Sequence, residues 1–465
     1  MKTERVAPSV IVSIFAVALA LRLAYVLGLY FGIGPEALLS QDSHGYRILA
    51  QDFIDTGQFN ETQIMPLYVL FLAAHFAISN SVDPLFPAIT QSGLDALTCV
   101  LIALIGARFS RAMALPAGLF AALCPTLIVL SGILYTDGPF LLLATAGLLL
   151  AMHWFSAPTW RIALMLGLVL GLALSTRVMI LPWIAALIVL LPLGAALCGR
   201  FRWRTLGHAA LVLILALAIQ APIIARNVSQ YDTWKLTTQG GAYALLWVVP
   251  LVREAADGTP QAEGARVLNE KFNALDVAAD LNPFARSAAM SALARDELQA
   301  LGLGAIAKGW AIGAAINLLS PATILSPPVA TLERTGFFET PGESKLSKVS
   351  AFLFHNDSPT YAWVLLVSIL GVVFIRLAQL GGLIVGFGRG HRARYGEPLP
   401  PTDTARMRRV LLGFLMIWVI YILLINGPIA SPKYRLPIEP VGAITFAFAV
   451  SGFQAWRARR RAQWQ

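Results

Sequence analysis

Apolar runs close to the roughly 20 residues that a helix needs to cross a bilayer recur along this sequence. They are separated by short clusters of Lys and Arg, and 57% of the 465 residues are hydrophobic. The mean hydropathy is +0.69, and such a composition lies far from the soluble average. The pattern predicts an all-α polytopic membrane protein, in which the first run, from Pro8 to Ile33, is a retained signal anchor.

The basic clusters predict the orientation of the helices, because Lys and Arg gather in cytoplasmic loops. Placing all clusters on one side requires an even number of spans between each pair, which predicts about ten helices and two cytoplasmic termini. The formal charge of +10 lies in these clusters, so we expect no nucleic-acid partner. The clusters are Lys2 and Arg5, Arg108 and Arg111, Arg161, the group Arg200, Arg202 and Arg204, the stretch from Arg389 to Arg409, and Arg457 to Arg461.

The domain organisation follows from this orientation. We expect an N-terminal transmembrane module over residues 1–225, an external periplasmic cap over 226–360 and C-terminal transmembrane helices over 361–465. The run from Pro66 to Ile78 is too short to span, so it should lie on the outer membrane surface within a first external loop over 34–83. The predicted spans after the first are 84–107, 113–135, 138–155, 161–176, 178–198, 206–225, 361–386, 409–427 and 438–455.

The cap segment mixes charge with helical periodicity. Residues Glu263 to Leu301 are expected to form two polar helices, and Leu303 to Leu319 an amphipathic helix at the membrane. Gly240-Gly241 and the Pro-rich stretch from Ser320 to Pro328 predict loops that can act as lids.

Charged residues are only 13% of the chain, so each one in or beside a span needs an explanation. Arg22 and Asp95 lie halfway along the first two spans and are expected to pair, because an isolated charge there costs several kcal/mol. Asp42 follows the first span, and it is either a catalytic carboxylate or the cap of a surface helix that starts near His44. Asp137 begins a span, where capping and function are both open.

A series of short motifs lies on the predicted outer face. They are the acidic loop from Asp42 to Gly57 with Tyr46, Leu49 and Ala50; Met65-Pro66-Leu67-Tyr68; Tyr135-Thr136-Asp137; Ser175-Thr176-Arg177; Ala221-Pro222 with Arg226-Asn227; Gly240-Gly241; and Ser431-Pro432-Lys433-Tyr434-Arg435-Leu436-Pro437. In their order and placement the chain resembles the polyprenyl-phosphate-sugar-dependent glycosyltransferases of the GT-C fold, which include the protein O-mannosyltransferases and the lipid A aminoarabinose transferase.

This resemblance implies a reaction as well as a GT-C-like helical bundle. An acceptor hydroxyl would attack the anomeric carbon of a sugar carried on a polyprenyl phosphate, with inversion, and the polyprenyl phosphate would leave. Asp42 would be the general base, and Asp137 a second acidic residue near the acceptor. Ser43 follows Asp42 where the protein mannosyltransferases have an Asp-Glu pair, so an envelope lipid or glycan is favoured over a protein as the acceptor.

An anionic leaving group needs fixed positive charge or a metal. Cations at external helix ends either clamp such a phosphate or snorkel to lipid headgroups. The candidates are Arg177, Arg226, Lys433 and Arg435, with Arg226 as the first choice. No dense Asp or His cluster indicates a metal, so we expect no required cofactor and leave a divalent ion open. Further contacts to the sugar or acceptor are assigned to His44, Tyr46, Glu61 and Tyr68.

Two other functions compete with this interpretation. They are a transporter or flippase of a lipid-linked saccharide, and a polysaccharide polymerase or ligase. Transporters often have internal repeats and broken helices near the bilayer midplane, and the sequence displays neither. The preferred prediction is a glycosyltransferase of a bacterial inner membrane, with a periplasmic site formed by the first loop, the loop after the third span and the cap. The sequence does not name the sugar, the acceptor or the oligomeric state.

Overall fold

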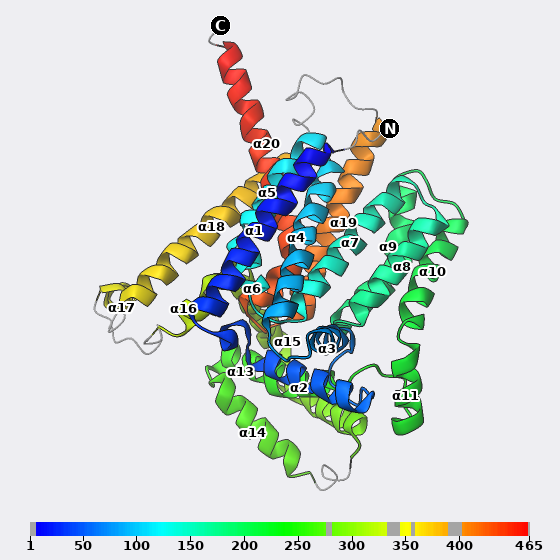
Figure 1. Cartoon of the computed structure of the whole chain (residues 1–465), viewed down its shortest axis with the longest axis vertical. Coiled ribbons are helices and arrows are strands. Elements are labelled where there is room, and N and C mark those ends of the chain that lie inside the picture. The colour runs from blue at the N-terminus through cyan, green and yellow to red at the C-terminus, as the bar shows by residue number, and fades with distance from the viewer. Residues whose placement is uncertain (1–5, 276–280, 333–344, 355–358, 389–401, 464–465) are drawn as a thin grey trace.

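The described part of the chain is helical throughout (Figure 1). The computed structural model describes residues 6–275, 281–332, 345–354, 359–388 and 402–463. Within these ranges every regular element is an α-, 3₁₀- or π-helix and there is no strand. The prediction of an all-α membrane protein is confirmed. Lys2, Arg5 and most of the basic stretch from Arg389 to Arg409 lie outside the described residues.

The long apolar runs form the helices of a bundle. By length and composition, eight described helices can cross a membrane, or up to ten if each of two bent pairs is one span. This range includes the predicted number of about ten spans, but the helices that qualify are not all the ones that the sequence predicts. α15 (Pro283–Leu319) is long enough although it was assigned to the cap, and α8 (Trp160–Leu174) has only 15 residues. The other bundle helices are α1 (Pro8–Gly32), α4 (Leu85–Ala107), α7 (Asp137–Ser156), α9 (Leu181–Leu197), α18 (Pro359–Phe387), α19 (Thr402–Asn426) and α20 (Glu439–Gln463).

Two of the predicted spans are broken near a proline. The run 113–135 forms α5 (Ala114–Leu123) after η2 (Arg111–Met113), and then α6 (Pro125–Ser131) after a bend of 50°. The run 206–225 forms α10 (Arg204–Ala218) and α11 (Ala221–Tyr231), bent by 58°. Pro125 and Pro222 lie in the first turn of the second helix, where a missing N–H is tolerated but the preceding helix cannot continue.

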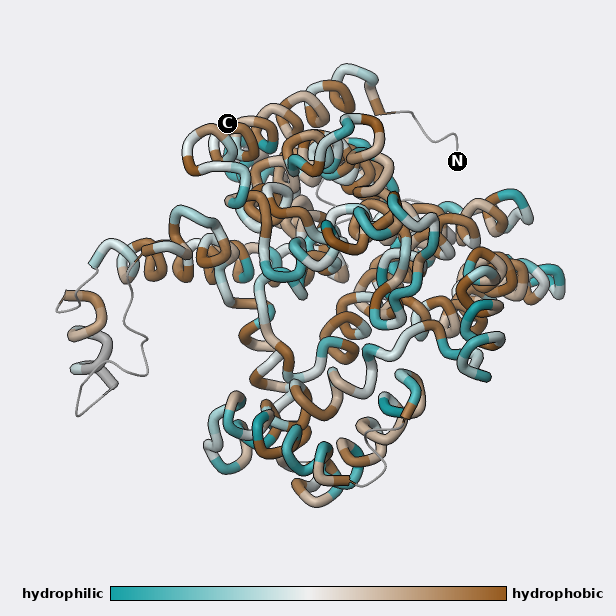
Figure 2. Tube along the Cα trace, turned by 60° about the horizontal axis from the view of Figure 1, so that its bottom comes forward, coloured by the Kyte–Doolittle hydropathy of each residue, from teal (hydrophilic) through white to brown (hydrophobic). Residues whose placement is uncertain are grey.

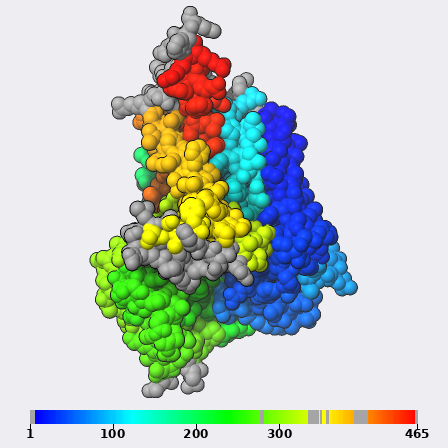
Figure 3. Space-filling view, turned by 90° about the vertical axis from the view of Figure 1, so that its left-hand side faces the viewer, coloured from blue at the N-terminus to red at the C-terminus, as the bar shows by residue number. Residues whose placement is uncertain are grey.

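The two ends of the bundle differ in charge. α1 begins and α20 ends at the end opposite α13 and α14 (Figures 1 and 3). Arg108 donates to Ser156 Oγ, and Arg200 Nη1 donates to the Phe155 carbonyl oxygen at 3.1 Å. Two basic clusters therefore meet at the C-terminus of α7, where the helix dipole favours cations, and they lie on one side of the bundle as predicted.

Residues 239–275 and 281–301 form a small helical layer, called the cap below. It contains α12 (Gln239–Tyr243), the π-helix η4 (Ala244–Val248), α13 (Val249–Asp257), α14 (Gln261–Asn273) and the first half of α15. Hydrophilic and hydrophobic residues alternate along these helices, whereas hydrophobic residues dominate the bundle (Figure 2). Gly302, at φ 81°, kinks α15 where the sequence predicts a break between two helices.

Both segments predicted as loops contain short helices. Gly240-Gly241 lies in α12, and the Pro-rich stretch forms η5 (Ala322–Leu325) and α16 (Pro327–Ala330). A Cβ on Gly241 would lie 2.2 Å from the carbonyl oxygen of Ser287 on α15. α12 therefore contacts the backbone of α15 directly, and only glycine fits at position 241.

The first external loop contains η1 (Pro35–Leu38), α2 (Gln41–Thr56) and α3 (Leu67–Ser79). Ser40 caps α2 in a capping box with Ser43, whose hydroxyl also donates to the Leu134 carbonyl oxygen at 2.7 Å. The alternative that Asp42 caps a helix near His44 is therefore wrong. Asp42 lies in the first turn of α2, where its carboxylate is free for other contacts.

The segment between α2 and α3 is held by Arg226 from α11. Its Nη1 donates to the carbonyl oxygens of Phe59 at 2.6 Å and Glu61 at 2.9 Å, while Nε and Nη2 donate to Asn227 Oδ1. Arg226 thus fastens the first loop to the bundle through protein oxygen atoms.

Arg22 and Asp95 do not form the predicted pair. Arg22 Nη1 donates to the Ala18 carbonyl oxygen at 3.1 Å, and Nη2 lies 3.3 Å from Cys99 Sγ. The expectation is wrong because the guanidinium finds backbone carbonyls, including that of Ala122 at 3.4 Å, close to its own depth.

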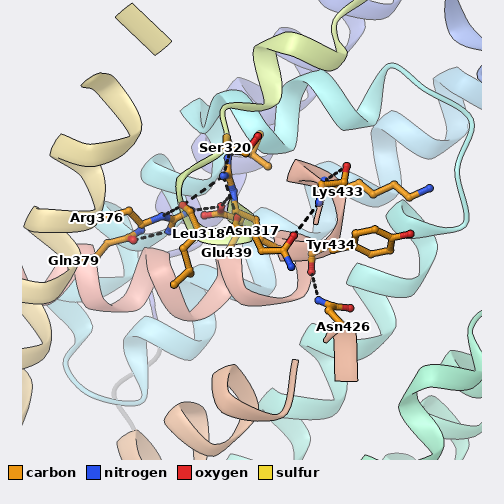
Figure 4. A network of polar contacts seen from close by, with 12 residues as sticks. Asn317, Leu318, Ser320, Arg376, Gln379, Asn426, Lys433, Tyr434 and Glu439 are labelled. Atoms are coloured by element: carbon orange, nitrogen blue, oxygen red, sulfur yellow. Dashed lines mark hydrogen bonds and ion pairs between the residues drawn. The ribbon is translucent and has the colours of Figure 1, made fainter. Parts of the chain in front are cut away.

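A cluster of ion-paired charges within the bundle lies instead around η7 (Pro432–Ile438). Glu439 Oε1 accepts from Arg376 Nη2 at 2.7 Å and from Arg435 Nε at 2.8 Å. Arg376 Nε also donates to the Leu318 carbonyl oxygen, so this triad of Arg376, Arg435 and Glu439 ties α18 and the end of α15 to α20. In Figure 4 Arg376 and Glu439 lie on one side, and the Lys433 and Tyr434 side chains point to the other.

Glu439→Gln should lower the free energy of unfolding by about 3–5 kcal/mol, because two buried guanidinium groups lose their counter-charge. Thermal unfolding in detergent can be followed by the reaction of buried Cys99 and Cys124 with a thiol-reactive dye. The matched control is Glu263→Gln, which breaks an exposed ion pair to Arg266 and should leave the unfolding curve unchanged. Identical unfolding of wild type and Glu439→Gln would mean that the triad does not support the fold.

Arg226→Ala should release the segment 57–65 without unfolding the bundle. The amide protons of this segment should exchange with deuterated solvent at least tenfold faster, since the segment loses two charge-assisted hydrogen bonds. Hydrogen exchange followed by mass spectrometry measures this. Arg161→Ala removes an exposed arginine elsewhere and is the control; equal exchange in both variants would contradict the role assigned to Arg226.

Candidate active site

Four charged side chains from distant parts of the sequence meet beside the cap. Lys433 Nζ, from η7, lies 2.9 Å from Asp42 Oδ2 on α2. Arg177, directly before η3 (Val178–Ile180), donates through Nη1 to Asp137 Oδ1 at the start of α7. All four were predicted as site residues. The structure brings them together as two carboxylates, each paired with a cation.

Tyrosines surround these charges. Lys433 Nζ lies 4.6 Å from the ring centroid of Tyr135 and 5.6 Å from that of Tyr434. The hydroxyl of Tyr434 is 2.6 Å from that of Tyr243, the last residue of α12, so the cap reaches the charged residues through this contact. Below, the site cluster denotes Asp42, Tyr46, Tyr135, Asp137, Arg177, Tyr243, Lys433 and Tyr434.

The electrostatics keep the tyrosines neutral and Arg177 charged. Burial raises the pKa of Tyr46, and burial together with the adjacent Tyr434 raises the pKa of Tyr243. Both phenols can therefore donate hydrogen bonds at neutral pH. Burial disfavours the charge of Arg177, but the Asp137 carboxylate and nearby tyrosines outweigh it and raise the pKa of Arg177.

The two carboxylates differ in access. The side chain of Asp42 is 49% exposed, whereas that of Asp137 is 6% exposed and lies against Arg177. A molecule from outside can therefore reach the Asp42 carboxylate, while Asp137 is placed to hold Arg177 in position.

Two predicted cations are not in the site cluster. Arg226 donates to backbone carbonyl oxygens of the first loop, as described above. Arg435 is buried beneath η7, where it binds Glu439, donates through Nη2 to Thr126 Oγ1 at 2.6 Å and also donates to the Ser320 carbonyl oxygen. The sequence predicts both residues at helix ends, but hydropathy gives the depth of a residue and not the direction of its side chain.

Three further predicted contacts lie around the cluster. Glu61 Oε1 accepts from the backbone N–H groups of Thr62 and Gln63, so it stabilises a turn. His44 Nε2 lies 3.6 Å from Glu36 Oε2. Tyr68 is buried behind Tyr46, with the two rings edge to face at 5.3 Å, and donates to Gln91 Oε1.

Tyr243, Tyr434 and Tyr135 were not predicted as site residues. Tyr135 lies two residues before Asp137, and Tyr434 directly follows Lys433, in motifs on which the resemblance rests. A tyrosine beside a predicted site charge is therefore a sequence signal that could have indicated both residues. Tyr243 follows Gly240-Gly241, but nothing in the sequence connects it with η7, which lies 191 positions further on. Among the described residues, no group of three or more His, Cys, Asp or Glu side chains is arranged to hold a metal ion.

Comparison with known proteins finds similarity in structure alone. No family model matches the chain, and no curated protein matches its sequence. The oligosaccharyltransferase of Archaeoglobus fulgidus, tethered to an acceptor peptide with an NVT sequon, superposes with a TM-score of 0.53 at 13% identity, over 96% of this chain and 50% of that one. The same organism's AglB, in complex with an inhibitory peptide and a dolichol-phosphate, gives 0.52 at 13% identity, over 98% and 51%.

A third match is ArnT from Cupriavidus metallidurans bound to undecaprenyl phosphate, with a TM-score of 0.39 at 15% identity, over 94% of this chain and 78% of that one. The chain spans about half the length of the oligosaccharyltransferases that it matches. Nearly all of it takes part in that superposition. The chain therefore has the GT-C fold, the fold of these oligosaccharyltransferases.

Proposed function

We propose that this protein is a membrane glycosyltransferase that moves a sugar from a polyprenyl-phosphate donor to a hydroxyl group of an envelope acceptor. The observation that carries the proposal is the site cluster, in which an accessible carboxylate, Asp42, lies beside two cations, Lys433 and Arg177. The GT-C fold supports it, since one protein of that fold is an oligosaccharyltransferase in complex with a dolichol-phosphate.

The proposed reaction assigns a role to each charge. Asp42 takes the proton of the acceptor hydroxyl, while the hydroxyl oxygen forms a bond to the anomeric carbon of the sugar. The bond from that carbon to the phosphate oxygen breaks, and the polyprenyl phosphate leaves with the electron pair. Attack opposite the leaving group inverts the anomeric carbon. Lys433 and Arg177 stabilise the negative charge on the departing phosphate.

The tyrosines suit the uncharged parts of the substrates. Tyr46 and Tyr243 are neutral donors within the cluster and can bind sugar hydroxyls. We place the reaction on the periplasmic side of a bacterial inner membrane, with a hexose or pentose as the sugar and a lipid, glycan or protein as the acceptor. No cofactor is required by this chemistry, because protein side chains supply both the base and the positive charge.

Asp42→Asn should lower the rate of glycosyl transfer by about 10²–10⁴-fold, the usual contribution of a general base. Transfer from a panel of polyprenyl-phosphate sugars to an envelope-lipid extract measures this, with purified protein and matched thermal unfolding. Arg177→Met should also lower the rate, because a phosphate partner is lost.

The control is Asp55→Asn, which removes an exposed carboxylate near the end of α2 and should transfer at the wild-type rate. Equal turnover by wild type and Asp42→Asn would remove Asp42 from the chemistry. Binding of lipid-linked sugar with no transfer to any acceptor would favour transport of the saccharide over glycosyl transfer.

A further inference from the structure

Lys433 has two competing tasks if the proposed function holds. Its ammonium is 2.9 Å from Asp42 Oδ2, and the lysine side chain is only 17% exposed. The same ammonium is one of the two cations available to a donor phosphate. One point charge cannot serve both anions fully.

The other cation of the cluster is less free to move. Arg177 is paired with Asp137, whose carboxylate is 6% exposed and has no other ion-pair partner among the described residues. Pulling Arg177 away would leave that buried carboxylate uncompensated, which is strongly unfavourable. Asp42, in contrast, is 49% exposed, so water can replace Lys433 at its carboxylate. The exchangeable partner of a phosphate is therefore Lys433.

The backbone of Lys433 is fixed, so an exchange needs only its side chain. Ser431, immediately before η7, donates its N–H to Asn317 Oδ1 at 2.9 Å, and Asn426 donates to the Tyr434 carbonyl oxygen at 2.9 Å. The lysine side chain, with its flexible four-carbon stem, turns about this anchored segment. The rings of Tyr135 and Tyr434 lie beside the ammonium and can stabilise it in either position.

We infer that Lys433 couples donor binding to activation of the base. Without donor it neutralises Asp42 and occupies Oδ2, the oxygen that would accept a proton. A phosphate in the site draws Lys433 away, and Oδ2 of Asp42 is then open to the acceptor hydroxyl. The base is then available only after the donor is bound. This inference rests on the proposed function and adds an order to it, with the donor before the acceptor.

The inference has an unusual consequence for binding. Removing the charge of a catalytic residue should tighten the binding of a substrate, because a free Lys433 no longer has to leave Asp42. We expect Asp42→Asn and Asp42→Ala to lower the Kd of a polyprenyl monophosphate by about two- to fivefold, the factor that a partly exposed ion pair supplies. Lys433→Gln should raise the Kd, and Asp42→Asn should have no effect on the Kd in the Lys433→Gln background.

The experiment measures the Kd of farnesyl phosphate by isothermal titration calorimetry in detergent, with farnesol as the uncharged control. The four proteins are the wild type, the two single variants Asp42→Asn and Lys433→Gln, and the double variant, each checked for wild-type thermal unfolding. Asp55→Asn, on the same helix as Asp42, should bind like the wild type.

Each alternative outcome has a separate meaning. Equal tightening by Asp42→Asn with and without Lys433 would show simple repulsion between the carboxylate and the phosphate, and would overturn the exchange. Unchanged or weaker binding by Asp42→Asn would also overturn it, while the proposed function would stand. If the wild type binds farnesyl phosphate no better than farnesol, the proposed function fails, and the coupling fails with it.

Discussion

The site depends on the two ion pairs that the buried carboxylate of Glu439 forms with Arg376 and Arg435. In the bundle interior a lone charge is costly, and a carboxylate shared by two guanidinium groups is stable only where all three are held in place. Arg376 and Arg435 meet this condition from α18 and η7, and each also donates to a carbonyl oxygen near the end of α15. A short 3₁₀-helix is thereby fixed between three long elements, and its opposite face presents Lys433 and Tyr434 (Figure 4).

The rest of the site is assembled on this fixed segment by separate local contacts. The capping box at Ser40 and the bond from Ser43 to Leu134 set the start of α2, and with it the position of Asp42. The pair of Arg177 with Asp137 joins the starts of α7 and η3. No single element contains the chemistry. The site exists only when the first loop, the bundle and the cap are folded together, which is typical of functional groups on connecting segments over a rigid scaffold.

The sequence predicted much of this arrangement, for identifiable reasons. The lengths of the apolar runs predicted most of the bundle and the short helix α3, and scarce charges at helix ends pointed to Asp42, Asp137, Arg177 and Lys433. The same signal selected Arg226 and Arg435, which instead bind protein oxygens, because hydropathy does not give the direction of a side chain. Breaks at Pro125 and Pro222 were missed, since composition stays apolar across them. Tyr243 could not be predicted from the sequence, because only the tertiary fold brings it to its partner Tyr434 in η7.

The contact of Gly241 with the backbone of Ser287 has a mechanical consequence. With no side chain between them, the backbones of α12 and α15 touch, and this contact sets the position of Tyr243, two residues after Gly241. Its hydroxyl rests on Tyr434, whose segment is locked to the bundle. Any molecule held beside Tyr434 therefore also meets a second hydroxyl, whose position is set by the packing of one cap helix on another.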